Sequence, residues 1–471
     1  MLKDVERIMA NFLWGQTELG PEHHWCSWRN LCYPVVENGL GIQAFEDVQG
    51  ASSCKLWWRY CNSTSLWATF MRSRYGAANG AEFGISRVWR RMLAVRDTVD
   101  QFTQAIDLEG RVQRAWVLTP SGDFTISSAW DALRPKQECL WSRKCVWSSR
   151  VPCKLAVFMW KLLNNYLPFP DALQRLGFQL PSKCQFCMGG ESQDHVLSDC
   201  TLATEVWNFF SRALSVPVTG PTGIIGRLQR WWLYQSPGTV RGVVCRVLPS
   251  LICWGLWKAR NMAMYEGAAA SPAQVCREVK SLLLNISQVY PFVQVARDDG
   301  ELAHLGFLLR MELKKSVLPR WVAWLRPPIG CVKLNIDGSS LGNPGLSGAG
   351  AVFRDSGGSI LCAFSWFLGS RTNMEAEAMA LLEGLLLSAT FHSLHVEMDS
   401  QVLLKMVNGN GTVPWRLWLT ILRIKSLVLG RQITFTHVYR EANAVADALA
   451  RLGSTTHVCQ SFPPSPLPAH I

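Results

Sequence analysis

The chain lacks the two features that would direct it into or across a membrane. It has 471 residues, 48% of them hydrophobic, but no uninterrupted apolar run reaches the roughly 20 residues that a bilayer helix needs. Its most apolar window, residues 243–257, contains Arg246 and Pro249, so we expect a buried helix there. Residues 1–7 carry charges where a secretory signal needs an apolar core. We therefore expect an intracellular protein, nuclear or cytoplasmic, with mostly reduced cysteines.

Acidic residues are fewer than basic ones, and almost all of the difference lies upstream of residue 330. Lys and Arg number 47 against 35 Asp and Glu, which gives a net charge of +12. From residue 330 onward the two kinds nearly balance, at 10 against 9, so the upstream part holds 37 against 26. A basic surface favours a polyanionic partner. We therefore expect the upstream region to bind nucleic acid.

Tryptophan is scarce at the C-terminal end, because only three of the 22 follow residue 330. The preceding segment, Leu325-Arg-Pro-Pro-Ile-Gly330, has the stiff, helix-ending composition of a linker. The length allows two to four domains, and we place a boundary here. The proline-rich tail, residues 456–471, is expected to be disordered.

Hydrophobic periodicity changes at the same boundary. Upstream, residues 156–163 and 203–214 have apolar side chains three and four positions apart, which indicates helices. Downstream, residues 332–337 and 394–399 alternate between apolar and polar side chains, which indicates strands. Residues 376–389 between them are rich in helix formers. We expect a mainly α-helical, Trp-rich region followed by an α/β domain, a mixed sheet flanked by helices.

Four acids are candidates for one site. Asp337 and Asp399 end the two predicted strands, Glu377 lies on the helix between them, and Asp447 begins the last helix. Four clustered carboxylates repel one another unless hard cations lie among them, which favours Mg²⁺ or Mn²⁺. Taken singly, each acid also fits a structural role, such as a turn, a helix cap or a pair with Arg451.

A second cluster has soft ligands. The pattern Cys184-x2-Cys187-x7-His195-x4-Cys200 supplies three thiols and one imidazole, as a tetrahedral Zn²⁺ site requires. With sixteen cysteines in the chain, chance clustering is the competing explanation. We expect a small zinc knuckle.

The C-terminal motifs together resemble ribonuclease H of type 1, as found at the end of plant non-LTR (LINE-type) retrotransposon polyproteins. The resemblance covers residues 330–455 and rests on five linked elements: Asp337-Gly-Ser-Ser-Leu-Gly-Asn-Pro-Gly345 with its glycine-rich continuation, Thr372-Asn373-x-x-x-Glu377, Met398-Asp399-Ser-Gln401, His437 and Asp447. It implies two Mg²⁺ or Mn²⁺ ions held by Asp337, Glu377, Asp399 and Asp447, with His437 as a mobile histidine that assists turnover.

The same resemblance implies contacts with an RNA/DNA hybrid. Asn343, Asn373 and Gln401 match positions that touch the minor groove in the family. Asn343 could instead fill a turn, Asn373 could cap its helix, and His437 could be an ordinary strand histidine. Glu375 lies two residues too early to match the family's glutamate.

The cysteine cluster lies within a longer resemblance. Trp147-Ser-Ser-Arg-Val-Pro-Cys-Lys-Leu-Ala-Val-Phe-Met-Trp160 and the four ligands resemble the zinc-binding domain that follows reverse transcriptase in non-LTR retroelements. The polymerase's aromatic-x-Asp-Asp turn is missing, because the one Asp-Asp pair, residues 298–299, follows Ala296-Arg297. We expect the C-terminal part of a retroelement polyprotein: a helical remnant of the polymerase-connecting region (1–120), the zinc-binding domain (121–215), a helical connector and linker (216–329), the ribonuclease H-like domain (330–455) and the tail.

These features predict a metal-dependent endonuclease that hydrolyses the RNA strand of RNA/DNA hybrids. The competing hypothesis is a non-catalytic, nucleic-acid-binding remnant of a retrotransposon. The upstream tryptophans could stack on bases, although at helical spacing they more often pack a core.

Overall fold

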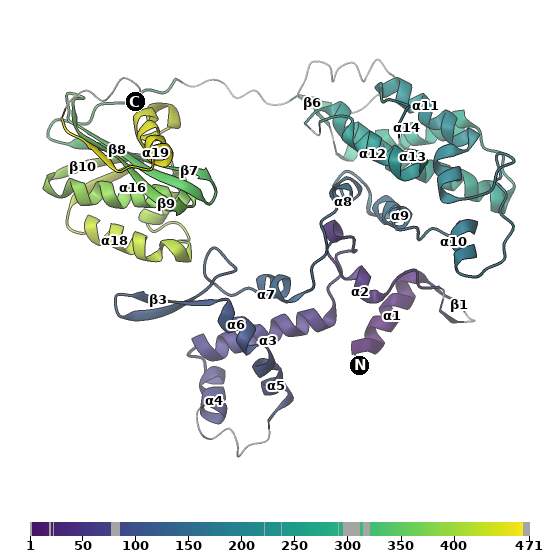
Figure 1. Cartoon of the computed structure of the whole chain (residues 1–471), viewed down its shortest axis with the longest axis horizontal. Coiled ribbons are helices and arrows are strands. Elements are labelled where there is room, and N and C mark those ends of the chain that lie inside the picture. The colour runs from purple at the N-terminus through teal and green to yellow at the C-terminus, as the bar shows by residue number, and fades with distance from the viewer. Residues whose placement is uncertain are drawn as a thin grey trace. The chain divides into compact units, whose positions relative to one another are not determined.

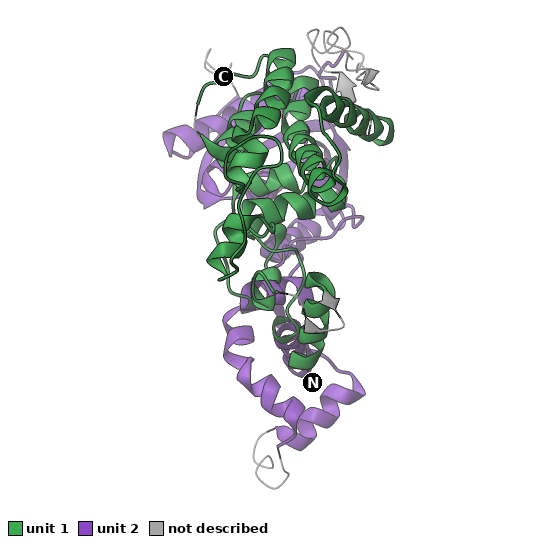
Figure 2. Ribbon diagram, turned by 90° about the vertical axis from the view of Figure 1, so that its right-hand side faces the viewer, with its two compact units in different colours: residues 1–47, 134–317 green, residues 48–133, 318–471 purple. Residues whose placement is uncertain are grey.

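The computed structural model describes residues 2–17, 20–21, 23–76, 85–220, 222–236, 238–290, 292–294, 311–313 and 321–464. The Asp-Asp pair at 298–299 and the last seven residues of the tail lie outside these ranges. The chain forms two compact units, residues 1–47 with 134–317 and residues 48–133 with 318–471 (Figure 2). Each unit combines two separate stretches of the sequence.

The first unit is mainly helical, as predicted for the upstream region (Figure 1). Its short paired strands are β1 (Gln16–Thr17) with β2 (Gly20–Pro21) and β5 (Phe292–Gln294) with β6 (Met311–Leu313). Its helices are α1 (Leu2–Trp14), α2 (Trp28–Leu31), α8 (Trp141–Val146), α9 (Cys153–Leu163), α10 (Pro170–Arg175), α11 (Thr201–Leu214), α12 (Gly223–Leu233), α13 (Val240–Glu266) and α14 (Pro272–Val289).

One hydrophobic core runs through most of this unit. It contains residues from Cys145 to Ile286, including Trp207 of α11 and Leu251 of α13. The boundary that we predicted at residue 215 therefore does not separate two cores, because α11 on one side of it and α13 and α14 on the other bury their apolar faces together.

The apolar window at 243–257 lies in α13, and the predicted buried helix is confirmed. By length and composition alone α13 could cross a membrane, but 72% of its most apolar 18-residue window is buried inside the structure. Helices α9, α11, α12 and α14 contact it and cover this apolar surface.

Residues 48–133 of the second unit contain most of α3 (Phe45–Asn62), followed by α4 (Leu66–Tyr75), α5 (Arg87–Ala94), α6 (Arg96–Gln101), the hairpin β3 (Thr103–Leu108)–β4 (Arg111–Trp116) and α7 (Ile126–Leu133). Trp57, Trp89 and Trp116 lie in one core here and are at most 7% exposed. Burial of these rings favours the core explanation for the tryptophans over base stacking.

The C-terminal part of the second unit contains a six-stranded mixed sheet, which confirms the predicted fold class. The strand order is β11-β10-β7-β8-β9-β12; β10 is parallel to β7 and β11, and the other neighbours are antiparallel. The elements in chain order are β7 (Val332–Gly342), β8 (Gly345–Arg354), β9 (Ile360–Arg371), α16 (Asn373–Leu387), β10 (Ser393–Met398), α17 (Gln401–Val407), α18 (Trp418–Val428), β11 (Gln432–His437), α19 (Ala444–Thr456) and β12 (Gln460–Phe462).

Helices α16 and α19 lie on opposite faces of this sheet (Figure 1). A Cβ atom on Gly338 of β7 would come within 2.1 Å of the Glu377 backbone nitrogen in α16. On β8, Cβ atoms on Gly348 and Gly350 would come within 2.2 and 2.3 Å of the Ala450 backbone in α19. Both helices therefore pack backbone to backbone against the central strands, which only glycine permits.

Two expectations at the ends of this domain need correction. The strand that we predicted to end at Asp337 continues to Gly342, because residues 333–342 all pair with β8. The tail that we predicted to be disordered contains β12, whose Phe462 pairs with Ala363 and packs beside Val352. Phe462 thus anchors β12 as an edge strand of the sheet, next to the proline-rich run.

Candidate active site and metal centre

Asp337 of β7 lies in the field of Asp399, the residue that follows β10. In the parallel pairing of β10 with β7, Glu397 is the partner of Asn335. Continuing this register by two residues brings Asp399 opposite Asp337. Asp337 is only 5% exposed and Asp399 is half-buried. The convergence that we predicted from strand alternation therefore arises from the pairing itself.

Glu377 comes from the first turns of α16. The Thr372 side chain caps this helix and Glu375 bonds back to Thr372, which forms a capping box. Glu375 is therefore a capping residue, whereas Glu377, two positions later, is 9% exposed. Asn373 Nδ2 donates to Glu377 Oε1 at 2.9 Å, and the buried Glu377 Oε2 has no hydrogen-bond partner.

The electrostatics join the acids into one site. Burial, followed by the charges of Asp399, Asp447 and Glu377, raises the pKa of Asp337 to about 8. Burial raises the pKa of Glu377 to about 7; the nearby Ser400 side chain lowers it and the charge of Asp399 raises it. Asp337 is thus the residue at which the fields of the other three carboxylates meet.

Asp447 is held from both sides. Arg440 Nη2 donates to its Oδ1 at 2.9 Å, and Arg451 Nε lies 3.0 Å from its Oδ2. The pair with Arg451, which we considered from the helical spacing, is present, but the pair with Arg440 was not anticipated. The start of α19 is fixed by Asn443, which is 2% exposed and donates to the Ile336 carbonyl of β7 at 2.9 Å.

The remaining candidates surround this cluster. His437, at the end of β11, donates from Nε2 to the Asp399 carbonyl at 3.1 Å. The side chain of Asn343 accepts from the Asn373 backbone N–H at 3.1 Å, so these two residues join the β7–β8 turn to the start of α16. Gln401 is exposed as the first residue of α17. Thr372, rather than Asn373, caps α16.

The donor set fits hard divalent cations. Carboxylate oxygens are the ligands that Mg²⁺ and Mn²⁺ prefer. The buried Oε2 of Glu377 lacks a partner, and a cation would satisfy it. Asp337, Glu377, Asp399 and Asp447 would hold such ions, provided that Asp447 exchanges a guanidinium partner for one.

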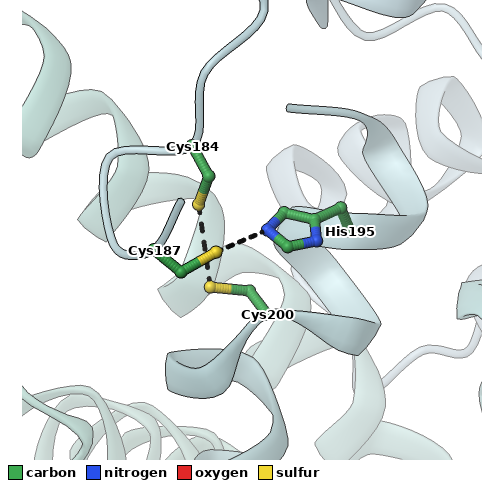
Figure 3. Close-up of side chains that lie close together, drawn as sticks. All are labelled: Cys184, Cys187, His195 and Cys200. Atoms are coloured by element: carbon green, nitrogen blue, oxygen red, sulfur yellow. Dashed lines mark hydrogen bonds between the residues drawn. The ribbon is translucent and has the colours of Figure 1, made fainter. Parts of the chain in front are cut away.

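Cys184, Cys187, His195 and Cys200 form a compact second centre (Figure 3). Their ligand atoms all lie within 4.8 Å of one another. The Cys184 and Cys200 sulfurs are 3.7 Å apart, close to the spacing of about 3.8 Å that tetrahedral zinc with bonds of about 2.3 Å requires. Cys187 Sγ lies 3.0 Å from His195 Nε2.

The backbone around these ligands has the geometry of a knuckle. The Phe186 and Gly189 N–H groups donate to the sulfurs of Cys184 and Cys187, each at 3.4 Å. The bond from Gly189 lowers the pKa of Cys187, whereas burial raises that of Cys184 to about 12. A Cβ atom on Gly189 would lie 2.9 Å from the His195 ring, so glycine lets the loop close over the imidazole.

Sequence reasoning missed two residues that shape the acid site, Arg440 and Asn443. Asn443 also accepts from Asn335, whose side chain donates to Glu397, so a buried polar network underlies the acids. The alternation in residues 332–337 placed Asn335 on the same face as Asp337 and could have indicated this network. No local spacing signals the pair of Arg440 with Asp447, because a turn separates them.

Comparisons with known proteins agree with these two centres. Residues 124–207 match the family described as zinc-binding in reverse transcriptase, and residues 335–453 match the family described as reverse transcriptase-like. The chain is similar to an Arabidopsis thaliana protein that is named as a ribonuclease H protein on a provisional basis. The two are 25% identical over 96% of this chain and 84% of the Arabidopsis protein.

Two further similarities concern the C-terminal domain. Ribonuclease HI of Halobacterium salinarum is 35% identical over 125 residues, which is 26% of this chain and 63% of that protein. The crystal structure of ribonuclease H1 from the same archaeon is 32% identical, with a TM-score of 0.26, and covers 27% of this chain and 98% of that one.

The chain therefore combines a zinc-binding domain of the reverse-transcriptase type with a ribonuclease H-like domain. The zinc-binding match precedes the reverse transcriptase-like match along the chain, which is the order that the resemblance led us to expect.

Proposed function

We propose that this protein is a metal-dependent endonuclease that hydrolyses the RNA strand of RNA/DNA hybrids. The observation that carries the proposal is the buried Asp337, whose carboxyl group lies in the fields of Asp399, Asp447 and Glu377. Enclosing four acids at one sheet edge is unfavourable unless a cation compensates their charge. The similarity to ribonuclease HI supports the choice of substrate.

Each group has a defined task in this proposal. Two divalent cations, when bound, would activate the attacking water and stabilise the leaving oxygen. Asp337, Glu377, Asp399 and Asp447 would orient the ions. We propose that His437, which donates to the Asp399 carbonyl, moves a proton as product leaves. Asn343, Asn373 and Gln401 are proposed to contact the hybrid's minor groove, where 2′-hydroxyls distinguish RNA from DNA.

The test is cleavage of a labelled RNA/DNA hybrid by the full chain with Mg²⁺, Ca²⁺ or chelator. We expect cleavage in the Mg²⁺ arm and none in the Ca²⁺ or chelator arm. Glu377→Gln should lower the cleavage rate at least about 100-fold, because it removes one of the carboxylates that would orient the ions. Glu375→Gln is the matched control, two residues away on the same helix, and should keep cleavage within about threefold while weakening the helix cap. An intact hybrid under conditions in which a reference ribonuclease H cuts it would contradict the proposal.

The competing hypothesis, a non-catalytic nucleic-acid-binding remnant, predicts a different pattern. Comparison of Asp399→Asn with the parent separates the two. Equal hybrid binding without cleavage by either protein would favour the remnant. Cleavage by the parent that the variant loses would exclude it.

We further propose that Cys184, Cys187, His195 and Cys200 hold one Zn²⁺ and that the basic upstream region contributes to nucleic-acid binding. The thiolate and imidazole ligands and their close spacing support zinc. The charge excess upstream of residue 330 supports binding of a polyanion, which would weaken steeply with salt.

A further inference from the structure

Arg440 is the one cationic side chain from outside α19 that is hydrogen-bonded to the acid cluster in the part of the chain that the structure describes. It lies in a 3-10 turn, Arg440–Ala442, between β11 and α19. Its guanidinium donates to Asp447 Oδ1 at 2.9 Å. The side chain of Arg440 is 66% exposed, whereas that of Asp447 is only 17% exposed. A solvent-exposed cation at the rim is thus bound to a carboxylate that is largely buried.

The two arginines on Asp447 are not equivalent. Arg451 is one helical turn away on α19, so its pair with Oδ2 is a local i,i+4 contact. Arg440 reaches Asp447 from another element. Asp447 raises the pKa of Arg440 first, and the charges of Asp337 and Asp399 raise it further. Arg440 therefore lies in the field of three of the four acids, Asp447, Asp337 and Asp399.

Arg440 and Arg451 each take one of the two Asp447 oxygens, so a divalent cation that bound this carboxylate would compete with a guanidinium. A carboxylate oxygen that accepts a charge-assisted hydrogen bond has less electron density to offer a metal, and two cations at one oxygen repel each other. We infer that Arg440 is a resident counter-cation of the acid cluster, which a divalent cation must displace from Asp447. The inference rests on the proposed function only in assigning a divalent cation to the acids.

Displacement leaves Arg440 free at the rim of the pocket. A guanidinium released beside a phosphodiester finds an alternative partner in a phosphate, with two parallel hydrogen bonds. Bound nucleic acid would therefore help to release Arg440 from Asp447. Without nucleic acid, Asp447 binds a cation less readily than with it.

The test is Ca²⁺ binding to the full chain by calorimetry without nucleic acid. Ca²⁺ is a suitable probe for the acids, because it prefers oxygen ligands and should not bind to the thiols of the cysteine–histidine centre. An exposed ion pair contributes roughly 0.2–1 kcal/mol, so Arg440→Gln should bind Ca²⁺ about 1.4- to fivefold more tightly. Arg440→Lys, which keeps the charge, should remain within about twofold of the parent.

Arg423→Gln, on α18, is the control for net charge, because Arg423 has no contact with Asp447 among the described interactions. Equal or weaker Ca²⁺ binding by Arg440→Gln, in protein that melts like the parent in chelator, overturns the inference. The outcome is separable from the proposed function: tighter Ca²⁺ binding in a protein that cleaves nothing keeps the inference, and cleavage with unchanged Ca²⁺ binding removes it.

Discussion

At the scale of single residues, the acid pocket is under electrostatic strain that its neighbours impose. Asp337 is buried, and the charges of Asp399, Asp447 and Glu377 oppose its ionisation. Without cations the pocket should therefore hold a proton near neutral pH, and ion binding should release it.

This strain makes stability depend on pH in a defined direction. The folded-state pKa of Asp337 is about 8 and its ordinary value is 3.8, so between these values the folded protein binds the proton and the unfolded chain does not. Stability then falls as pH rises from about 4 to about 8 and levels off above it. In chelator, Asp337→Asn should raise the melting temperature by about 4 °C or more at pH 8.5 and by little near pH 4.

The matched control for this measurement is Asp355→Asn. Asp355 accepts from the Ser359 backbone in an exposed turn, away from the acids. A stabilisation by Asp337→Asn that is equal at both pH values would contradict the assigned burial of charge.

The residues of this pocket were predictable to different degrees. The period-two alternation of two strands predicted that Asp337 and Asp399 converge, because alternation fixes the face and parallel pairing fixes the level. Arg440 was not predictable, because its pair with Asp447 depends on how the turn before α19 folds. The helical spacing had suggested Arg451, which binds the other oxygen.

At the scale of elements, the position of Glu377 depends on how closely α16 approaches β7. A methyl group on Gly338 would lie 2.1 Å from the Glu377 nitrogen and 2.4 Å from the Ala376 carbonyl carbon. These are backbone atoms, so the whole helix must move. Gly338→Ala should destabilise the protein by about 3 kcal/mol and lower any hybrid cleavage at least about 10-fold, measured by denaturant unfolding and the cleavage assay.

Gly369→Ala provides the comparison. A Cβ atom on Gly369 would meet nothing within 4 Å, but the φ of +74° at this position is unfavourable for alanine. The substitution should cost about 1 kcal/mol and leave cleavage nearly unchanged. Similar losses of stability and cleavage in both variants would contradict the assignment of the Gly338→Ala effect to the clash with α16.

Element types were easier to predict than element ends. The helix formers in 376–389 correspond to α16, and the strand at 394–399 corresponds to β10. The extension of β7 to Gly342 depends on its hairpin pairing with β8, and β12 depends on pairing with the distant β9; neither pairing leaves a periodic signal in these short segments.

At the scale of the whole molecule, the two metal-binding candidates belong to different cores. Cys184 and Cys200 are buried in the core that α11 and α13 share, and the acids border the core beneath the mixed sheet. No residue is common to these two cores. The sequence could assign a ligand type to each centre, but not the joining of residues 48–133 with 318–471 in one unit.

This separation predicts independent responses to metal removal. Cys184→Ser in the full chain should lose zinc by elemental analysis and lower the melting of the helical unit, because a buried ligand set loses its ion. Cys139→Ser, which replaces an exposed thiol outside the set, should change neither. Any Mg²⁺-dependent hybrid cleavage should stay within about threefold in both variants. Full zinc content in Cys184→Ser would contradict the ligand assignment.

The two glycines of strand β8 that face α19 have a consequence for judging from sequence whether this domain is intact. Gly348 and Gly350 let α19, and with it Asp447, rest on the sheet. A side chain at either position would push α19 away from the sheet, although all four acids would still be present in the sequence. The presence of all four carboxylates in a sequence is therefore not sufficient evidence that the fold which positions them is intact, and these two glycines have to be checked as well.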